Sequence, residues 1–191
     1  VADEVVERIV AIARGLKVGD PNDPTVQLGP LASERQHDRV RSYLELAVTE
    51  HAHAAVGGST LDRPGFYVEP TVFVGVEAQM RIAREEIFGP VLSVIPFDTE
   101  EEATAIANSV EFGLSANIWT SDVSRMLRLA ERIEAGTIWG NTARLLHPGL
   151  PFGGFKDSGL GNASGEGALE GNTRLKRVSV LYDAQGPGFA A

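Results

Sequence analysis

The sequence contains no cysteine among its 191 residues. This absence excludes a disulfide framework, a thiolate metal site and a cysteine nucleophile within the chain. Positive charge is also scarce: 17 lysines and arginines stand against 26 aspartates and glutamates, so the formal net charge is −9 and the pI is near 4.9. An acidic chain has no electrostatic support for binding a phosphate backbone, and we expect no nucleic-acid partner.

Long apolar runs are missing as well. The longest, residues 87–97, is too short and too interrupted by glycine and proline to cross a bilayer, so no membrane partner is expected. No secretory signal is visible, and we expect a cytoplasmic protein. His51 and His53 are two positions apart near the end of an expected helix, which points them to different faces, so no metal site is predicted.

Helical and strand patterns alternate along much of the chain, whose length allows one sizeable core. Ser33 with Gln36, and Thr99 with Glu102, form capping-box patterns, and Asp122 can cap a further helix. The alternation predicts an α/β fold with a largely parallel sheet flanked by helices. Four helices are expected: one from the start of the chain to near Gly19, one from Ser33 to Gly57 with an apolar side that includes Val48, one after Thr99 and one after Asp122. The expected strands are 66–68, 71–76, 91–97, 114–120 and 137–139, and the strand at 91–97 is expected to be buried.

The carboxyl-terminal third differs in composition from the rest of the chain. Glycine is dense between Gly140 and Gly171, but Phe152 and Phe155 favour an ordered loop over a linker. Residues 174–181 again have a pattern typical of a strand, and this strand could pair with a sheet edge or with a partner subunit. We therefore expect a domain over residues 1–172, an oligomerisation strand over 173–184 that protrudes from it, and a frayed tail over 185–191.

The first residues are already helical in pattern, with no leading strand. This start suggests a piece cut from a longer protein; tag removal or processing of a complete protein is the alternative.

The segment from Glu85 to Val91 combines two carboxylates, the apolar pair Ile87-Phe88 and the helix-breaking pair Gly89-Pro90. From the residues alone it is either a charged surface turn or a carboxylate placed to meet a ligand, because loops between rigid elements carry function. A phosphate loop at residues 159–164 is not predicted: its third glycine is replaced by Ser164, and no strand precedes it.

The segment Glu85-Glu86-Ile87-Phe88-Gly89-Pro90-Val91 closely resembles a signature of the NAD(P)-dependent aldehyde dehydrogenase superfamily. Other stretches resemble the same family in the same order: Pro70-Thr71-Val72-Phe73 before it, then Phe112-Gly113-Leu114-Ser115-Ala116, Gly136-Thr137-Ile138-Trp139-Gly140-Asn141 and Pro151-Phe152-Gly153-Gly154-Phe155-Lys156-Asp157-Ser158-Gly159. The resemblance extends to about Tyr182. It implies the carboxyl-terminal part of the catalytic domain, with the nucleophilic cysteine and the general-base glutamate upstream, so no catalytic residue is expected in this chain and the chain alone should be inactive.

The resemblance also implies roles for residues that are present. Glu86 matches the glutamate that binds the nicotinamide ribose of NAD or NADP, and Phe88 matches an aromatic residue that packs near the nicotinamide ring. Phe152 matches an aromatic residue lining the pocket for a small-molecule aldehyde, and Leu146 and Arg144 fall in the variable loop that shapes substrate choice. Arg144 could meet a carboxylate on the aldehyde or could be a surface arginine. Glu85 is expected to have a surface or structural role.

The resemblance implies aldehyde oxidation to a carboxylic acid through a cysteine thioester, in a homodimer or homotetramer whose subunits share the 175–181 strand. One departure matters: where many hydrolytic members carry Gly-Arg-Glu, this chain has Gly161-Asn162-Ala163, which puts the proton relay of deacylation in doubt. Two alternatives therefore stay open, a non-catalytic homologue that serves oligomerisation or binding, and a CoA-acylating relative.

Overall fold

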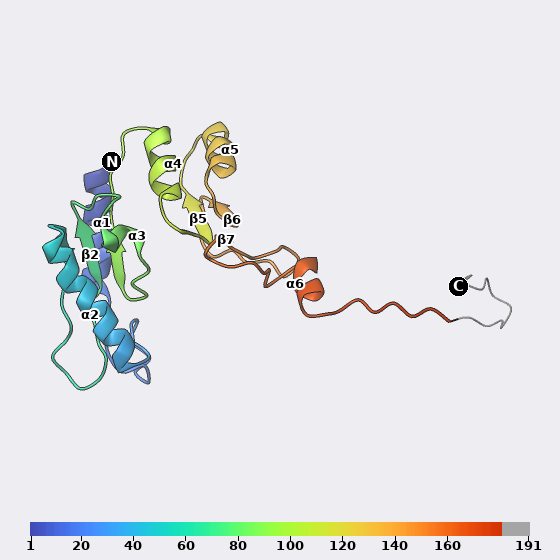
Figure 1. Ribbon diagram of the computed structural model, residues 1–191. Helices are drawn as coiled ribbons and strands as arrows, with labels where there is room; N and C mark the ends of the chain where they lie inside the picture. The colour runs from blue at the N-terminus through green and yellow to red at the C-terminus, as the bar shows by residue number, and fades with distance from the viewer. Residues whose placement is uncertain (181–191) are drawn as a thin grey trace. The chain divides into compact units, whose positions relative to one another are not determined.

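The computed structural model describes residues 1–180, and the chain forms two compact units, Val1–Glu111 and the part from Phe112 onward (Figure 1). Each unit is an α/β assembly with its own strand pairs. The first contains α1 (Ala2–Gly15), α2 (Glu34–Thr49), β1 (His53–Val56), β2 (Thr71–Val74), α3 (Arg81–Arg84), β3 (Val91–Ser93) and α4 (Glu100–Asn108). The second contains β4 (Phe112–Gly113), β5 (Ser115–Ile118), α5 (Val123–Arg132), β6 (Thr137–Gly140), β7 (Phe155–Lys156) and α6 (Glu166–Gly171).

The sheet of the first unit is ordered β1-β2-β3, with β1 antiparallel and β3 parallel to the central β2. Neighbouring residues of a strand point to opposite faces, and β2 shows this directly. Phe73 joins the core beneath α2, whereas Val72 lines an apolar groove of about 450 Å³ together with Ile9 and Ile12 of α1. The two helices therefore cover opposite faces of the sheet.

The core of the first unit is formed by one stripe of α2 and the sheet face beneath it. Val40, Tyr43, Leu44 and Ala47, at the spacing of a helix face, are all buried. They pack in one cluster with buried apolar residues of β2, of α3 and of the loops between the elements: Ala52, Val68, Phe73, Val76, Ile82 and Ile87. Burial of this kind is the main stabilising contribution to such a unit.

Three element predictions for the first unit were wrong. The second helix ends at Thr49 and not at Gly57, because His51 turns left-handed (φ 63°) and His53–Val56 then pairs with β2; Val48, in the last turn, is 71% exposed. The 91–97 strand is only three residues long and is not buried, since Leu92 is exposed. Residues 66–68 contribute a single isolated bridge, from Val68 to Thr60.

The second unit holds two separate two-stranded ladders. The parallel pair β5-β6 confirms the parallel strands expected from the strand–helix–strand pattern, with α5 as the crossover. The antiparallel pair β4-β7 joins Phe112-Gly113 to Phe155-Lys156, so the glycine-rich stretch is ordered, as expected. Residues 173–180 form neither helix nor strand in the single chain, and the remainder of the expected strand and the expected frayed tail lie outside the described residues.

Candidate functional site

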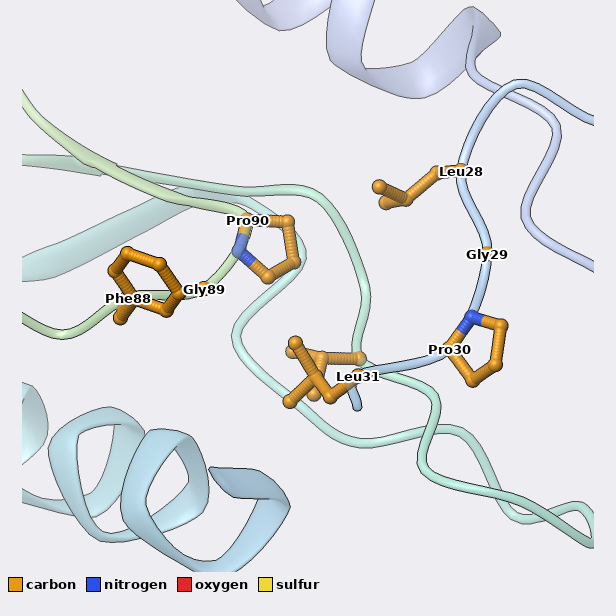
Figure 2. A pocket seen from close by; sticks show the side chains of 8 residues that line it. Leu28, Gly29, Pro30, Leu31, Phe88, Gly89 and Pro90 are labelled. Atoms are coloured by element: carbon orange, nitrogen blue, oxygen red, sulfur yellow. The ribbon is translucent and has the colours of Figure 1, made fainter. Parts of the chain in front are cut away.

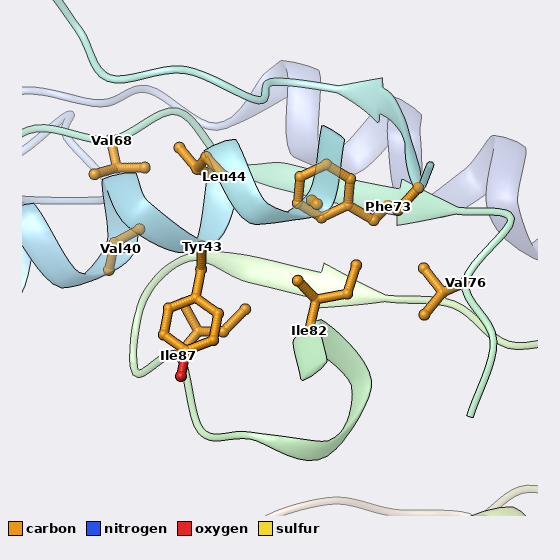
Figure 3. Close-up of a cluster of buried hydrophobic side chains, with 10 residues drawn as sticks. Val40, Tyr43, Leu44, Val68, Phe73, Val76, Ile82 and Ile87 are labelled. Carbon is orange, nitrogen blue, oxygen red and sulfur yellow. The ribbon is translucent and has the colours of Figure 1, made fainter. Parts of the chain in front are cut away.

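The segment between α3 and β3 presents two of the predicted site residues to solvent. Glu86 and Phe88 are exposed, while Ile87 between them is buried in the core cluster of α2 (Figure 3). Ile87 thus anchors a short irregular stretch whose neighbouring side chains point outward. A carboxylate and an aromatic ring on such an anchored loop are well placed to contact a ligand.

Phe88 has a left-handed backbone (φ 58°) and a side chain that is 74% exposed. A left-handed conformation is strained for a bulky residue and persists only where its surroundings hold it. Phe88 is one of the residues that line an apolar pocket of about 460 Å³, and Figure 2 shows their side chains. The pocket is lined by residues of the loop before α2, by one residue of the loop before β2, and by the segment itself: Leu28, Gly29, Pro30, Leu31, Val68, Phe88, Gly89 and Pro90.

Glu85 is tied into a network of charges and hydrogen bonds. Its carboxylate accepts from Arg81 Nε at 2.6 Å, from Arg81 Nη2 at 3.0 Å and from the Tyr43 hydroxyl at 2.5 Å. These bonds, those from Arg81 above all, lower the pKa of Glu85 to about 2. Burial and the bond to Glu85 raise the pKa of the Tyr43 phenol. The expected structural role of Glu85 agrees with these contacts.

Two further side chains of α2 reach the same segment, and the sequence analysis assigned neither of them to the site. Gln36 Nε2 donates to the carbonyls of Ile87 (3.0 Å) and Phe88 (2.8 Å), and Arg39 Nη2 donates to the carbonyl of Glu86 (2.5 Å). The capping-box pattern was half right: Ser33 Oγ accepts from the Gln36 backbone N–H at 3.3 Å, but the Gln36 side chain turns to the segment. The sequence did hold a signal for these contacts: positions 36 and 39 are polar, lie three residues apart and so share one side of the helix, next to its apolar stripe.

The second unit carries the other predicted residues. Phe152 stacks on Trp139, with ring centroids 6.4 Å apart and planes inclined by 24°. The Trp139 indole N–H donates to the Leu145 carbonyl at 2.9 Å, which ties down the loop that holds Arg144 and Leu146. Both of these side chains are exposed, and Arg144 has a left-handed backbone (φ 57°). The structure thus gathers Phe152 and this loop around one tryptophan.

The glycine-rich stretch packs backbone against backbone. The Gly153 carbonyl lies where a side chain on Gly136 would be, so that position accepts only glycine. Gly153 also bridges to Asn162, and the Ala163 N–H donates to the Phe152 carbonyl at 2.8 Å. Ala163 therefore supports the Phe152 backbone through its N–H and offers no carboxylate.

The described residues, 1–180, contain no group of three or more histidine, aspartate or glutamate side chains arranged to hold a metal ion. Within the same residues, every helix is too short or too polar to cross a bilayer.

Comparison with known proteins assigns the chain to a family. The sequence model of the aldehyde dehydrogenase family matches residues 1–178. A betaine aldehyde dehydrogenase of Mesorhizobium japonicum is 44% identical over 182 aligned positions, which cover 93% of this chain and 37% of the relative. One from Rhizobium johnstonii is 43% identical over 193 positions, covering 100% of this chain and 39% of the relative. The chain thus spans little more than a third of the length of these relatives.

Solved structures show the same fold. The NAD+ complex of an aldehyde dehydrogenase from Bacillus cereus matches with a TM-score of 0.89 and 39% identity, over 95% of this chain and 37% of that one. A Mycobacterium tuberculosis aldehyde dehydrogenase complexed with NAD+ matches with a TM-score of 0.84 and 43% identity, over 89% of this chain and 35% of that one. The chain belongs to the aldehyde dehydrogenase family.

Proposed function

We propose that this chain is the carboxyl-terminal part of an enzyme that oxidises an aldehyde to a carboxylic acid with NAD+ or NADP+. The observation that carries the proposal is the anchored segment, which exposes Glu86 and Phe88 on either side of buried Ile87. The solved relatives from Bacillus cereus and Mycobacterium tuberculosis are complexes with NAD+, which favours NAD+ as the first cofactor to test.

The residues fit one end of a nicotinamide cofactor. The Glu86 carboxylate has two oxygens that can accept from both hydroxyls of the nicotinamide ribose. Phe88 offers an aromatic face two residues away and lines an apolar pocket. When bound, NAD(P)+ accepts the hydride that leaves the aldehyde carbon. The contribution of this chain is to hold the ring and ribose in place for that transfer.

The aldehyde is proposed to meet the second group of residues. Phe152, kept in place by Trp139, gives one apolar wall, and the loop with Leu146 and Arg144 shapes the entrance. The nucleophile of the thioester step is proposed to be a cysteine outside these 191 residues, since the chain has none. The chain by itself is therefore proposed to be inactive.

The test is NADH formation by the full-length protein that carries this chain, measured over a panel of aldehydes with NAD+ and NADP+ compared. Glu86→Gln is expected to weaken cofactor binding roughly tenfold to hundredfold, because a hydrogen-bonded charge is lost. Phe88→Ala should lower the rate of hydride transfer. Glu77→Gln, which neutralises an exposed carboxylate outside the segment, is the matched control. Unchanged cofactor affinity and hydride transfer in Glu86→Gln would refute its assigned role.

The product separates the open alternatives. Ala163 removes a carboxylate that many hydrolytic members have, so the reaction is run with and without CoA. Release of the free acid without CoA supports the hydrolytic enzyme. Product formation only with CoA identifies an acylating enzyme, and a lack of turnover with every aldehyde identifies a non-catalytic homologue.

A further inference from the structure

The loop between β6 and Phe152 carries positive charge and no negative charge. From residue 135 to residue 156 the sequence has no aspartate or glutamate, although the chain as a whole has a formal net charge of −9. In the entrance loop, residues 141–151, the ionisable side chains are Arg144 and His147. We propose that the entrance loop selects an aldehyde whose far end bears a carboxylate; the inference rests on the proposed function.

The entrance loop is tied down, so its exposed side chains have a fixed support. At its start, Asn141 Oδ1 accepts from the Thr120 N–H and Asn141 Nδ2 donates to the Thr120 carbonyl, both at 2.9 Å. In its middle, the Leu145 carbonyl accepts from the Trp139 indole N–H at 2.9 Å. A loop held in this way can discriminate between substrates, because little order has to be gained when one binds.

Arg144 is the cation that the loop presents. Its side chain is exposed, and within residues 1–180 it makes no hydrogen bond, ion pair or ring contact. Its backbone is left-handed (φ 57°), which is strained for a long side chain, and the next residue, Leu145, is the one that Trp139 holds. An arginine with only a surface role does not need this backbone. The guanidinium offers a planar fork of N–H donors that matches the two oxygens of a carboxylate.

His147 adds a second donor to the loop. Its Nδ1 accepts from the Gly149 N–H at 3.1 Å, so the neutral ring carries its proton on Nε2, which can donate. The large apolar side chains of the loop are Leu145, Leu146 and Leu150, all of them exposed. Donors together with aliphatic side chains suit a molecule that combines a carboxylate with an aliphatic chain.

The same residues disfavour a cationic aldehyde. A quaternary ammonium is recognised by the open faces of aromatic rings or by carboxylates. The entrance loop has no carboxylate, and Trp139 and Phe152 stack on each other, so each ring covers part of the other's face. Betaine aldehyde, the compound in the names of the relatives from Mesorhizobium japonicum and Rhizobium johnstonii, is a trimethylammonium cation, which the charge of Arg144 would repel. We therefore expect this protein to prefer a different aldehyde.

The test is the kcat/KM of the full-length protein for three aldehydes, measured as NADH formation. The first is 4-oxobutanoate, the second is butanal, which has the same chain length and no charge, and the third is betaine aldehyde. We expect the value for 4-oxobutanoate to exceed that for butanal about tenfold to hundredfold, the effect of one hydrogen-bonded ion pair, and betaine aldehyde to be the poorest substrate.

The outcomes separate this inference from the proposed function. If butanal or betaine aldehyde is used as well as 4-oxobutanoate or better, the preference for a carboxylate is refuted and the proposed function stands. If none of the aldehydes gives NADH, with or without CoA, the proposed function fails and the inference with it.

Arg144→Met assigns the preference to one residue. It keeps an unbranched side chain and removes the charge, so the ratio of kcat/KM for 4-oxobutanoate to that for butanal should fall to near one. Arg144→Lys keeps the charge without the planar fork and should give an intermediate ratio. Arg35→Met is the matched control, since Arg35 is an exposed arginine of α2 in the first unit. The same ratio in Arg144→Met as in this control would overturn the role of Arg144.

Ionic strength gives a measurement that needs no variant. Salt screens the attraction between an exposed guanidinium and a carboxylate, whereas butanal carries no charge to be screened. Between about 0.02 M and about 0.5 M NaCl we expect the KM for 4-oxobutanoate to rise relative to the KM for butanal. A constant ratio of the two KM values would show that charge does not select the aldehyde, contrary to the proposal.

Discussion

Gly89 shows how closely the exposed segment approaches α2. A methyl group on Gly89 would lie 2.6 Å from Cγ2 of Val40, a side chain with no exposed surface. Such a contact is far inside van der Waals distance, and Val40 cannot move away within a packed core. The glycine of the family signature is thus needed for packing, in addition to ending the preceding turn.

Gly89→Ala is expected to lower the free energy of unfolding by about 1–3 kcal/mol, as overpacked cores do. Urea denaturation of the chain measures it. Gly75→Ala is not a suitable control because Gly75 is left-handed (φ 66°); Gly161→Ala is better, since nothing lies within 4 Å of an added methyl group there and no left-handed backbone is required. If Gly89→Ala were as stable as Gly161→Ala, the close approach to Val40 would be wrong.

Glu85 makes stability depend on pH in a defined direction. Its pKa is about 2 in the folded chain against an ordinary value of 4.5, so the unfolded state binds the proton first as pH falls. The stabilising contribution of the carboxylate is therefore complete above pH 4.5 and is lost as pH falls toward about 2. The difference in unfolding free energy between the wild type and Glu85→Gln should be constant from pH 7 to 5 and then shrink.

The control for this pH dependence is the same comparison in an Arg81→Met background. The bonds from Arg81 are the largest cause of the lowered pKa of Glu85, so most of the dependence should disappear there. A difference that instead grows as pH falls would mean that the pKa of Glu85 is raised by folding, contrary to the contacts in the structure.

Individual residues were predictable where the chemistry is local. Thr99 Oγ1 accepts from the Glu102 N–H at 3.1 Å and Asp122 Oδ1 from the Arg125 N–H at 3.1 Å, as the capping patterns predicted. The Gln36 side chain was not predictable, because its partners lie 51 and 52 residues away and the spacing in the sequence equally suits a cap. Roles for Glu86 and Phe88 came from the family resemblance, and their assignment stays a prediction.

Among the elements, the helices with a capping residue were predicted best. α4 and α5 begin where Thr99 and Asp122 cap them, but β1 was mistaken for the end of α2. His53–Val56 has little strand character of its own and becomes a strand by pairing with β2, a contact across 16 to 21 positions. Long-range pairing of this kind overrides local preference and is invisible to periodicity.

The cap of α5 can be tested by itself. Asp122→Ala should lower the free energy of unfolding by about 1 kcal/mol, because the Arg125 N–H loses its acceptor. Asp122→Asn keeps an acceptor oxygen and removes only the charge, so most of the stability should be retained. Urea denaturation compares the three proteins. Equal losses in both variants would show that charge at the helix start, and not the capping bond, stabilises α5.

For the whole molecule, the sequence carried the family and the fold class, while the three-dimensional partners of each element came only from the structure. Within the described residues, 1–180, residues 173–180 belong to no helix or strand, and their apolar side chains Leu175, Val178 and Val180 are exposed. An extended segment with a free backbone and apolar side chains can add to the edge of a sheet in another subunit.

We therefore expect the full-length protein to be a homodimer or homotetramer that depends on this segment. Val178→Asp is expected to reduce the assembled fraction, because a charge would have to be buried against the partner's sheet. Val123→Asp, which makes the same substitution at an equally exposed valine outside the segment, is the control. Sedimentation velocity at several protein concentrations measures the mass. If the mass of Val178→Asp equals that of the control at every concentration, residues 173–180 do not hold the subunits together, and another surface must.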